Sequence, residues 1–229
     1  MKKTFLIPLM IFFCSDLQGQ NTTEKSNFDL TELKLGSTNI NDIINKKTKE
    51  NDFTIGNEKF RSTKSKKILT INNLTLQNQT RDTSFTNYVS FEYNEKNIIV
   101  GYILAYYTLK ENPKIVYHQL KEKLGMPSFR YFSSNYDQEN ENYDAVIWED
   151  KEHNKLYRLR YHSWEPEGLR ELRITVLMNS ESDVEDTAYT ALPFYFWRDY
   201  INARNELGND NYTYQEFIKK RPSFKWNTK

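Results

Sequence analysis

Residues 112–178 are the part of the chain whose pattern most narrows its fold. They predict one helix over residues 113–124, a strand hairpin over residues 145–162 and a third strand over residues 169–178. A looser version of the same order precedes them, over residues 35–107. The chain is therefore expected to have an α+β fold, with an antiparallel sheet built from two helix-plus-strand-meander units and helices on one face.

The helix over residues 113–124 has clear signals at both ends. Asn112 is a good N-cap and Pro113 suits the first helical position. Gly125 supplies a left-handed stop, and Pro127 prevents the helix from resuming. Its buried stripe is formed by Val116, Leu120 and Leu124.

The first unit contains the clearest hairpin, over residues 88–107. Val89, Phe91 and Tyr93 alternate with more polar neighbours, and both faces of the returning strand carry apolar or small residues. This pattern is typical of a central strand that is covered on one side. In contrast, residues 46–57 and 128–144 are polar and are predicted to be loops.

The last part of the chain is predicted to be a pair of helices. The first covers residues 193–207 and ends at Gly208. The second covers residues 214–220, and Thr213 and Glu216 have the spacing of a capping box.

The expected organisation follows from these elements. It consists of a signal peptide (residues 1–19), a disordered spacer (20–27), an α+β domain (28–182, with units 28–108 and 109–182) and a helical extension packed on that domain (183–229).

The first residues have the layout of a secretory signal peptide. Lys2 and Lys3 precede an apolar run over residues 5–13, about half the length of a bilayer span. Cleavage after Gly19 is expected, giving a periplasmic or secreted protein without a transmembrane span. The alternative is a lipoprotein anchored through Cys14.

Charge and cysteine content exclude several classes of protein. Removing Lys2, Lys3 and Asp16 from totals of 32 basic and 31 acidic residues leaves thirty of each. A neutral chain lacks the basic excess of a dedicated nucleic-acid binder. Because Cys14 is the only cysteine, the expected mature chain has no disulfide and no thiol nucleophile.

Catalytic and metal motifs are missing from the sequence. The three histidines have no paired ligand spacing, and neither a GxSxG motif nor a glycine-rich phosphate loop occurs. No catalytic residue, metal or cofactor is therefore expected. An acidic loop over residues 137–144 leaves calcium binding open. Two groups of carboxylates leave a hydrolase, such as a glycosidase, as the alternative function. They are Glu149, Asp150 and Glu152 beside Trp148, and Glu165 and Glu167 beside Trp164.

Binding has more support, because aromatic and arginine side chains gather in two neighbouring strands and their turn. These types are enriched at the energetic centres of protein interfaces. Strand alternation directs Tyr157 and Tyr161 away from Arg158 and Arg160, so one set can be core. Arg158 or Arg160 is also expected to lie across from Arg173, where like charges need an acidic partner or a ligand. The alternative to a binding surface is that Glu149, Glu171 and the acidic loop over residues 137–144 neutralise these arginines within the fold. The candidate binding residues are Tyr157, Arg158, Arg160, Tyr161, Trp164, Arg170 and Arg173.

The segment Leu33-Lys34-Leu35-Gly36-Ser37-Thr38 resembles the start of the repeats in two families of small exported binding proteins, the β-lactamase-inhibitor-like proteins and the outer-membrane assembly lipoproteins. The second unit departs from that start, since it opens with Asn112-Pro113. The resemblance implies an architecture and no functional residues. The sequence thus predicts an exported, non-enzymatic interaction protein whose partner is a protein or an envelope component. An inhibitor or an immunity protein is a special case of this function.

Overall fold

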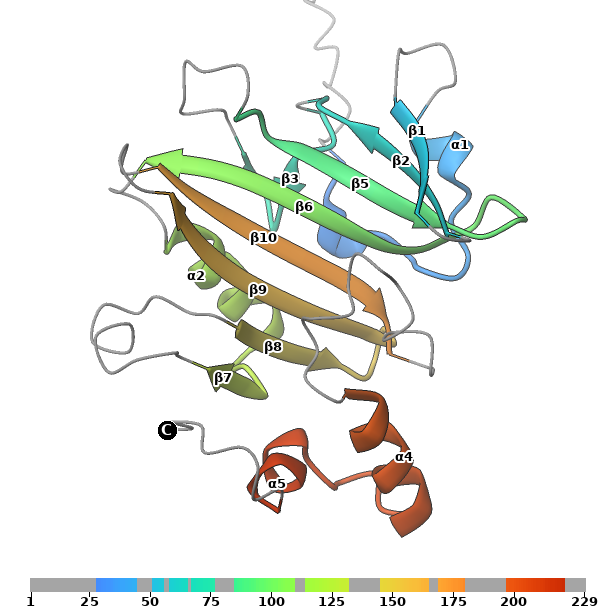
Figure 1. Ribbon diagram of the computed structural model, residues 1–229, viewed down its shortest axis with the longest axis vertical. Helices are drawn as coiled ribbons and strands as arrows, with labels where there is room; N and C mark the ends of the chain where they lie inside the picture. The colour runs from blue at the N-terminus through green and yellow to red at the C-terminus, as the bar shows by residue number, and fades with distance from the viewer. Residues whose placement is uncertain are drawn as a thin grey trace, which may run out of the picture.

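The computed structural model describes residues 28–44, 51–55, 58–65, 67–76, 85–109, 114–131, 145–164, 169–179 and 197–220 (Figure 1). In chain order the elements are η1 (Leu30–Glu32), α1 (Ile40–Ile43), β1 (Asn51–Ile55), β2 (Glu58–Thr63), β3 (Thr70–Ile71), β4 (Leu74–Thr75), β5 (Tyr88–Tyr93), β6 (Ile99–Leu109), α2 (Ile115–Leu124), β7 (Phe129–Tyr131), β8 (Ala145–Asp150), β9 (Lys155–Trp164), β10 (Leu169–Met178), α4 (Trp197–Leu207) and α5 (Tyr214–Lys219).

Eight of the strands form one antiparallel sheet in the order β1-β2-β5-β6-β10-β9-β8-β7. Each half of the chain contributes four strands, and the last strands of the two halves, β6 and β10, pair at the centre (Figure 1). The short strands β3 and β4 form a separate hairpin. The predicted α+β class is confirmed, and so are the strand-rich character of both halves and the helical pair at the end of the chain.

Both edges of the sheet contradict the sequence prediction. Residues 51–55 and 129–131 form the edge strands β1 and β7, although both segments were expected to lie in loops. An edge strand has a neighbour on one side only, and natural edge strands are often short and polar. With five and three residues, β1 and β7 are too short for their alternation to stand out in the sequence.

One face of the sheet packs against η1, α1, α2 and the β3–β4 hairpin. Because side chains alternate along a strand, every second residue of the inner strands enters this core. The buried cluster includes Leu30, Ile40, Val89, Phe91, Tyr102, Leu104, Val116, Leu120, Trp148, Tyr157, Leu159, Leu172, Ile174 and Val176. The predicted helical stripe of Val116 and Leu120 is thereby confirmed.

Polar atoms of large buried side chains bind the backbone of the covering layer. The Tyr102 hydroxyl donates to the oxygen of Leu30 at 3.0 Å, and the Lys155 ammonium donates to that of Thr31 at 2.7 Å. The Trp148 indole donates to the oxygen of Gly125 at 3.1 Å, at the end of α2. These bonds satisfy groups that burial would otherwise leave unpaired, and they attach η1 and α2 to the sheet.

The C-terminal helices pack on the other face, at the β7–β8 side of the sheet. Leu156 neighbours Tyr157 on β9 and therefore points away from the first core. A second buried cluster joins the sheet to α4 and α5 and consists of Phe129, Ile147, Leu156, Leu177, Tyr200, Tyr212, Tyr214, Phe217 and Ile218. Among the described helices, none has the length and apolar content needed to cross a membrane.

Candidate interaction surface

Tyr157 and Tyr161, two of the three aromatic residues that sequence analysis placed in the binding surface, lie in the core. Tyr157 is 1% exposed and Tyr161 is 8% exposed, and both belong to the cluster under η1 and α2. They point to the helix-covered face because they alternate with Arg158 and Arg160. Tyr157 and Tyr161 are therefore core residues and not part of the exposed surface, because strand alternation turns them away from the arginine face.

Arg158 and Arg160 of β9 and Arg173 of β10 lie on the opposite face. Arg160 is directly opposite Arg173, as expected from the sequence, and Arg158 is opposite Thr175. Arg158 is only 5% exposed, whereas Arg160 and Arg173 are half-buried. The part of this face that reaches solvent is therefore the part around Arg160 and Arg173.

The structure does not place Arg170 and Trp164, the two remaining predicted binding residues, beside Arg160 and Arg173. Arg170 alternates with Glu171 on β10 and so lies on the helix-covered side, opposite Thr108. Trp164 ends β9 opposite Leu169, and its side chain is outside the described residues. Of the seven predicted residues, the structure brings Arg160 and Arg173 together at the surface. Arg158 lies two residues from Arg160 along β9, on the same face, and is buried.

Two tyrosines that sequence analysis did not select complete the surface. The strand registers align Tyr88, Ala105, Arg173 and Arg160 in one row across β5, β6, β10 and β9. Tyr107 lies in the next row, opposite Glu171. Both tyrosines are half-buried. We call Tyr88, Tyr107, Arg160 and Arg173 the arginine–tyrosine surface.

Glu171 holds one side of this surface in place. Its Oε1 atom accepts hydrogen bonds from Arg173 Nη2 at 2.6 Å and Nε at 3.2 Å. The Tyr107 hydroxyl lies 3.5 Å from the same oxygen. Since Glu171 is only 5% exposed, its carboxylate is a fixed acceptor beneath the surface. It neutralises Arg173 locally and orients it together with Tyr107.

Arg160 differs from Arg173 in its contacts. Within the described part of the chain, no ion pair or hydrogen bond of the Arg160 side chain is found. Its guanidinium therefore lies beside a second guanidinium and has no carboxylate of its own among those residues. Like charges that face each other across two strands destabilise a sheet unless an acid balances them.

The ring of Tyr107 has a further aromatic neighbour. Phe85 packs against it with ring centroids 5.6 Å apart and an angle of 59° between the rings. Phe85 is also half-buried. The surface thus combines cations with an apolar rim on the four middle strands of the sheet.

Glu149, one of the carboxylates considered for a hydrolase, aligns with Leu156 and Leu177. Glu171, the buried carboxylate beneath the arginine–tyrosine surface, lies six residues from Leu177 on β10, or roughly 20 Å at a rise of about 3.3 Å per residue. Glu149 and Glu171 are therefore too far apart to act as a glycosidase pair, whose carboxylates lie within about 5–9.5 Å of each other.

The other groups of that candidate site have structural contacts or lie elsewhere. Trp148 points into the first core. Glu149 binds Arg204 of α4 and accepts a hydrogen bond from Asn179 at 2.9 Å. Asp150 lies 3.0 Å from the His153 ring nitrogen. Glu165, Glu167 and the acidic loop over residues 137–144 lie outside the described residues. The described residues also contain no group of three or more His, Cys, Asp or Glu side chains that could hold a metal ion.

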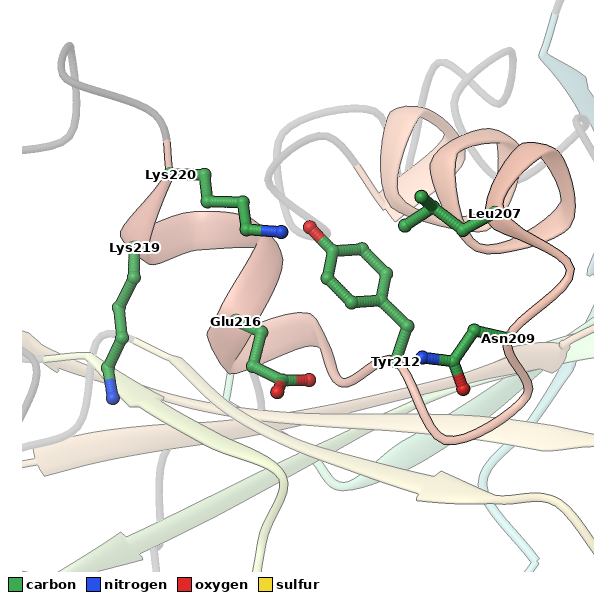
Figure 2. Close-up of a pocket in the computed structure, with 6 residues that line it drawn as sticks. All are labelled: Leu207, Asn209, Tyr212, Glu216, Lys219 and Lys220. Carbon is green, nitrogen blue, oxygen red and sulfur yellow. The ribbon is translucent and has the colours of Figure 1, made fainter.

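An open pocket of about 490 Å³ lies between the ends of α4 and α5 (Figure 2). The Lys220 ammonium lies 4.9 Å from the centroid of the Tyr212 ring. The Glu216 carboxylate accepts bonds from the backbone and hydroxyl of Thr213, at 2.7 and 2.8 Å. Lys219 points away from Tyr212 in Figure 2. These polar groups mainly stabilise the helix–helix connection. The pocket is lined by Leu207, Asn209, Tyr212, Glu216, Lys219 and Lys220.

Comparison with known proteins gives no relative: no family model, curated protein or solved structure matches the chain.

Proposed function

We propose that this chain is an exported, non-enzymatic interaction protein that binds another protein through the arginine–tyrosine surface. The observation that carries the proposal is the position of Arg160 directly opposite Arg173, both half-buried, on the central strands of the sheet. Export is supported by the signal-like segment at residues 1–19.

The residue types of the surface suit protein recognition. Arginine and tyrosine are enriched among the residues that dominate binding energy, because they combine large contact area with directional hydrogen bonds. Tyr88 and Tyr107 flank the arginines across β5 and β6. A partner that covers the arginine–tyrosine surface would bury two aromatic side chains and compensate the opposed cations. An inhibitor or immunity protein that neutralises an exported enzyme or toxin is one form of such a function.

The rigidity of the supporting sheet favours the same function. The row from Tyr88 to Arg160 crosses four strands, including the central pair β6 and β10. Glu171 fixes Arg173 from below. A surface that is ordered before binding loses less conformational entropy when a partner docks.

The experiment is a capture assay with the mature chain, residues 20–229, immobilised and exposed to the exported proteins of its source organism. Arg160→Ala and Tyr107→Ala remove parts of the surface. Arg130→Ala is the matched control, because Arg130 is a half-buried arginine of β7 opposite Val146, whose side chain enters the first core. Arg130 therefore lies on the other face of the sheet.

We expect a stoichiometric protein that is retained by the original chain and by Arg130→Ala, and is lost or weakened by Arg160→Ala and Tyr107→Ala. Circular dichroism of each variant checks that the fold is intact. The proposal is wrong if no exported protein is retained, or if Arg130→Ala weakens capture as much as Arg160→Ala does.

A further inference from the structure

We infer that the arginine–tyrosine surface recognises an acidic protein segment whose carboxylate binds between Arg160 and Arg173. This inference rests on the proposed function and specifies the chemistry of the partner.

The first argument is the geometry of the two arginines. They are paired residues of the antiparallel strands β9 and β10, so their Cα atoms are about 4.5–5.5 Å apart. One carboxylate above the strands can therefore be reached by both side chains. An ionised carboxylate has two oxygens and about four acceptor positions, which is enough for two guanidinium groups.

The second argument is the charge balance. Glu171 binds Arg173 through two hydrogen bonds and does not form an ion pair with Arg160. Together, Arg160, Arg173 and Glu171 carry one excess positive charge, and the buried Arg158 lies two residues from Arg160 along β9 on the same face. An anionic group above Arg160 and Arg173 is therefore favoured. The Glu171 carboxylate repels a doubly charged phosphate more strongly than a singly charged carboxylate.

The third argument favours a protein segment as the ligand, because aromatic rings lie beside the two arginines. The Tyr107 hydroxyl is turned toward Glu171, and its ring is packed at an angle against Phe85. Both contacts hold the ring as an apolar rim beside the cations. An acidic side chain with apolar neighbours, as in a protein segment, fits such a rim. An acidic polysaccharide is the competing ligand that the test must exclude.

In this arrangement Arg160 and Arg173 contact the ligand, and Glu171 is a positioning residue. A guanidinium offers donors in a planar fork that matches a carboxylate, whereas a lysine ammonium offers only a point charge. Arg160→Lys should therefore keep part of the affinity, and Arg160→Ala should lose most of it.

The test measures binding of poly-L-glutamate and of polygalacturonate to the mature chain by calorimetry at low salt. The same measurement is made on Arg160→Ala, Arg160→Lys and the control Arg130→Ala. We expect poly-L-glutamate to bind more tightly than polygalacturonate. Arg160→Ala should lower that affinity about tenfold, Arg160→Lys should fall between it and the original chain, and Arg130→Ala should change it little.

Two results would overturn the inference. One is an equal effect of Arg160→Ala and Arg130→Ala on poly-L-glutamate binding. The other is tighter binding of polygalacturonate, which would identify a polysaccharide ligand. Because Arg160→Lys keeps the charge and nearly the size of the side chain, it gives an answer even where Arg160→Ala unfolds the protein.

The outcomes also separate this inference from the proposed function. If a captured exported protein is not displaced by poly-L-glutamate and is insensitive to Arg160→Ala but sensitive to Tyr107→Ala, the interaction function stands and the carboxylate site fails. If no protein is captured while poly-L-glutamate binds in an Arg160-dependent manner, the protein-binding function fails and the carboxylate site remains.

Discussion

The ammonium group of Lys155 on β9 donates a 2.7 Å hydrogen bond to the backbone oxygen of Thr31 in η1, 124 residues earlier in the chain. Lys155 is 3% exposed. The Tyr157 hydroxyl lies 3.5 Å from the same oxygen. The first element of the fold is thus attached to the second half of the sheet by buried polar groups.

Replacing Lys155 by Met should weaken the attachment of η1 to the sheet, because methionine fills a similar volume but donates no hydrogen bond and leaves the Thr31 oxygen with only the longer contact to Tyr157. We expect the free energy of unfolding to fall by about 1–3 kcal/mol, the usual cost of a buried acceptor that loses its donor. Urea denaturation measures this change, and hydrogen exchange should show faster exchange in residues 30–33. Unchanged exchange there would contradict the anchoring role.

Alkaline pH should destabilise the protein through its buried tyrosines. Burial raises the pKa of Tyr102 and Tyr157, and burial together with the Glu149 carboxylate raises that of Tyr200 to about 12. In the unfolded chain these phenols ionise near pH 10. Above that pH the unfolded state therefore binds fewer protons than the folded state, and the free energy of unfolding falls as the pH rises.

One group opposes this trend. Burial lowers the pKa of Lys155, so the folded state releases that proton at a lower pH than the unfolded state does. Its contribution to stability increases as the pH rises from the lowered pKa toward 10.5. Three tyrosines outweigh one lysine above pH 10, so urea denaturation at pH 8, 10 and 11 should show a net loss. A flat profile would mean that the phenols are not protected by burial.

The ion pair between Glu149 and Arg204 should couple α4 to the sheet. Both side chains are largely buried, and Arg204→Met would leave the Glu149 carboxylate with Asn179 and the Tyr200 hydroxyl as its nearby donors. We expect a loss of about 2–4 kcal/mol in the free energy of unfolding, since an uncompensated buried charge is costly.

The double variant Glu149→Leu/Arg204→Met should be more stable than Arg204→Met alone, because it removes the orphaned charge. Urea denaturation of the two single variants and the double variant gives the coupling energy. Losses that simply add would show that the two residues act independently.

The capping box should stabilise α5. Thr213 Oγ1 accepts a hydrogen bond from the Glu216 backbone at 3.2 Å, and the Glu216 carboxylate binds the Thr213 backbone and hydroxyl. Thr213→Ala should cost about 1 kcal/mol, whereas Thr213→Ser retains the hydroxyl and should cost less. Thermal denaturation of both variants measures the difference.

The same box lowers the pKa of Glu216 through its bonds to the Thr213 backbone and side chain. The contribution of Glu216 is present at neutral pH and is lost as the pH falls through that lowered pKa. In Thr213→Ala the pKa of Glu216 should move back toward its ordinary value, which an NMR titration detects. An unchanged pKa would contradict the role of the threonine hydroxyl.

Local signals account for the elements that could be predicted. The stripe of Val116 and Leu120, the stop at Gly125 and the Thr213–Glu216 box all depend on residues within one or two turns of each other. The alternation in β5, β6 and β10 is equally local. The edge strands β1 and β7 were missed, because their formation depends on a neighbouring strand more than on their own residues.

By itself, the sequence determined the α+β class, the positions of α2, α4 and α5 and of the strands β5, β6, β8, β9 and β10, and the two-sided alternation that separates tyrosines from arginines on β9. Only the tertiary structure decided which side is core, because η1, α1 and α2 had to cover one face. It also set the pairing of β6 with β10, and with it the row that joins Tyr88 to Arg160. Which strands of the two halves become neighbours depends on contacts between residues far apart in the chain, whereas alternation within a strand is local.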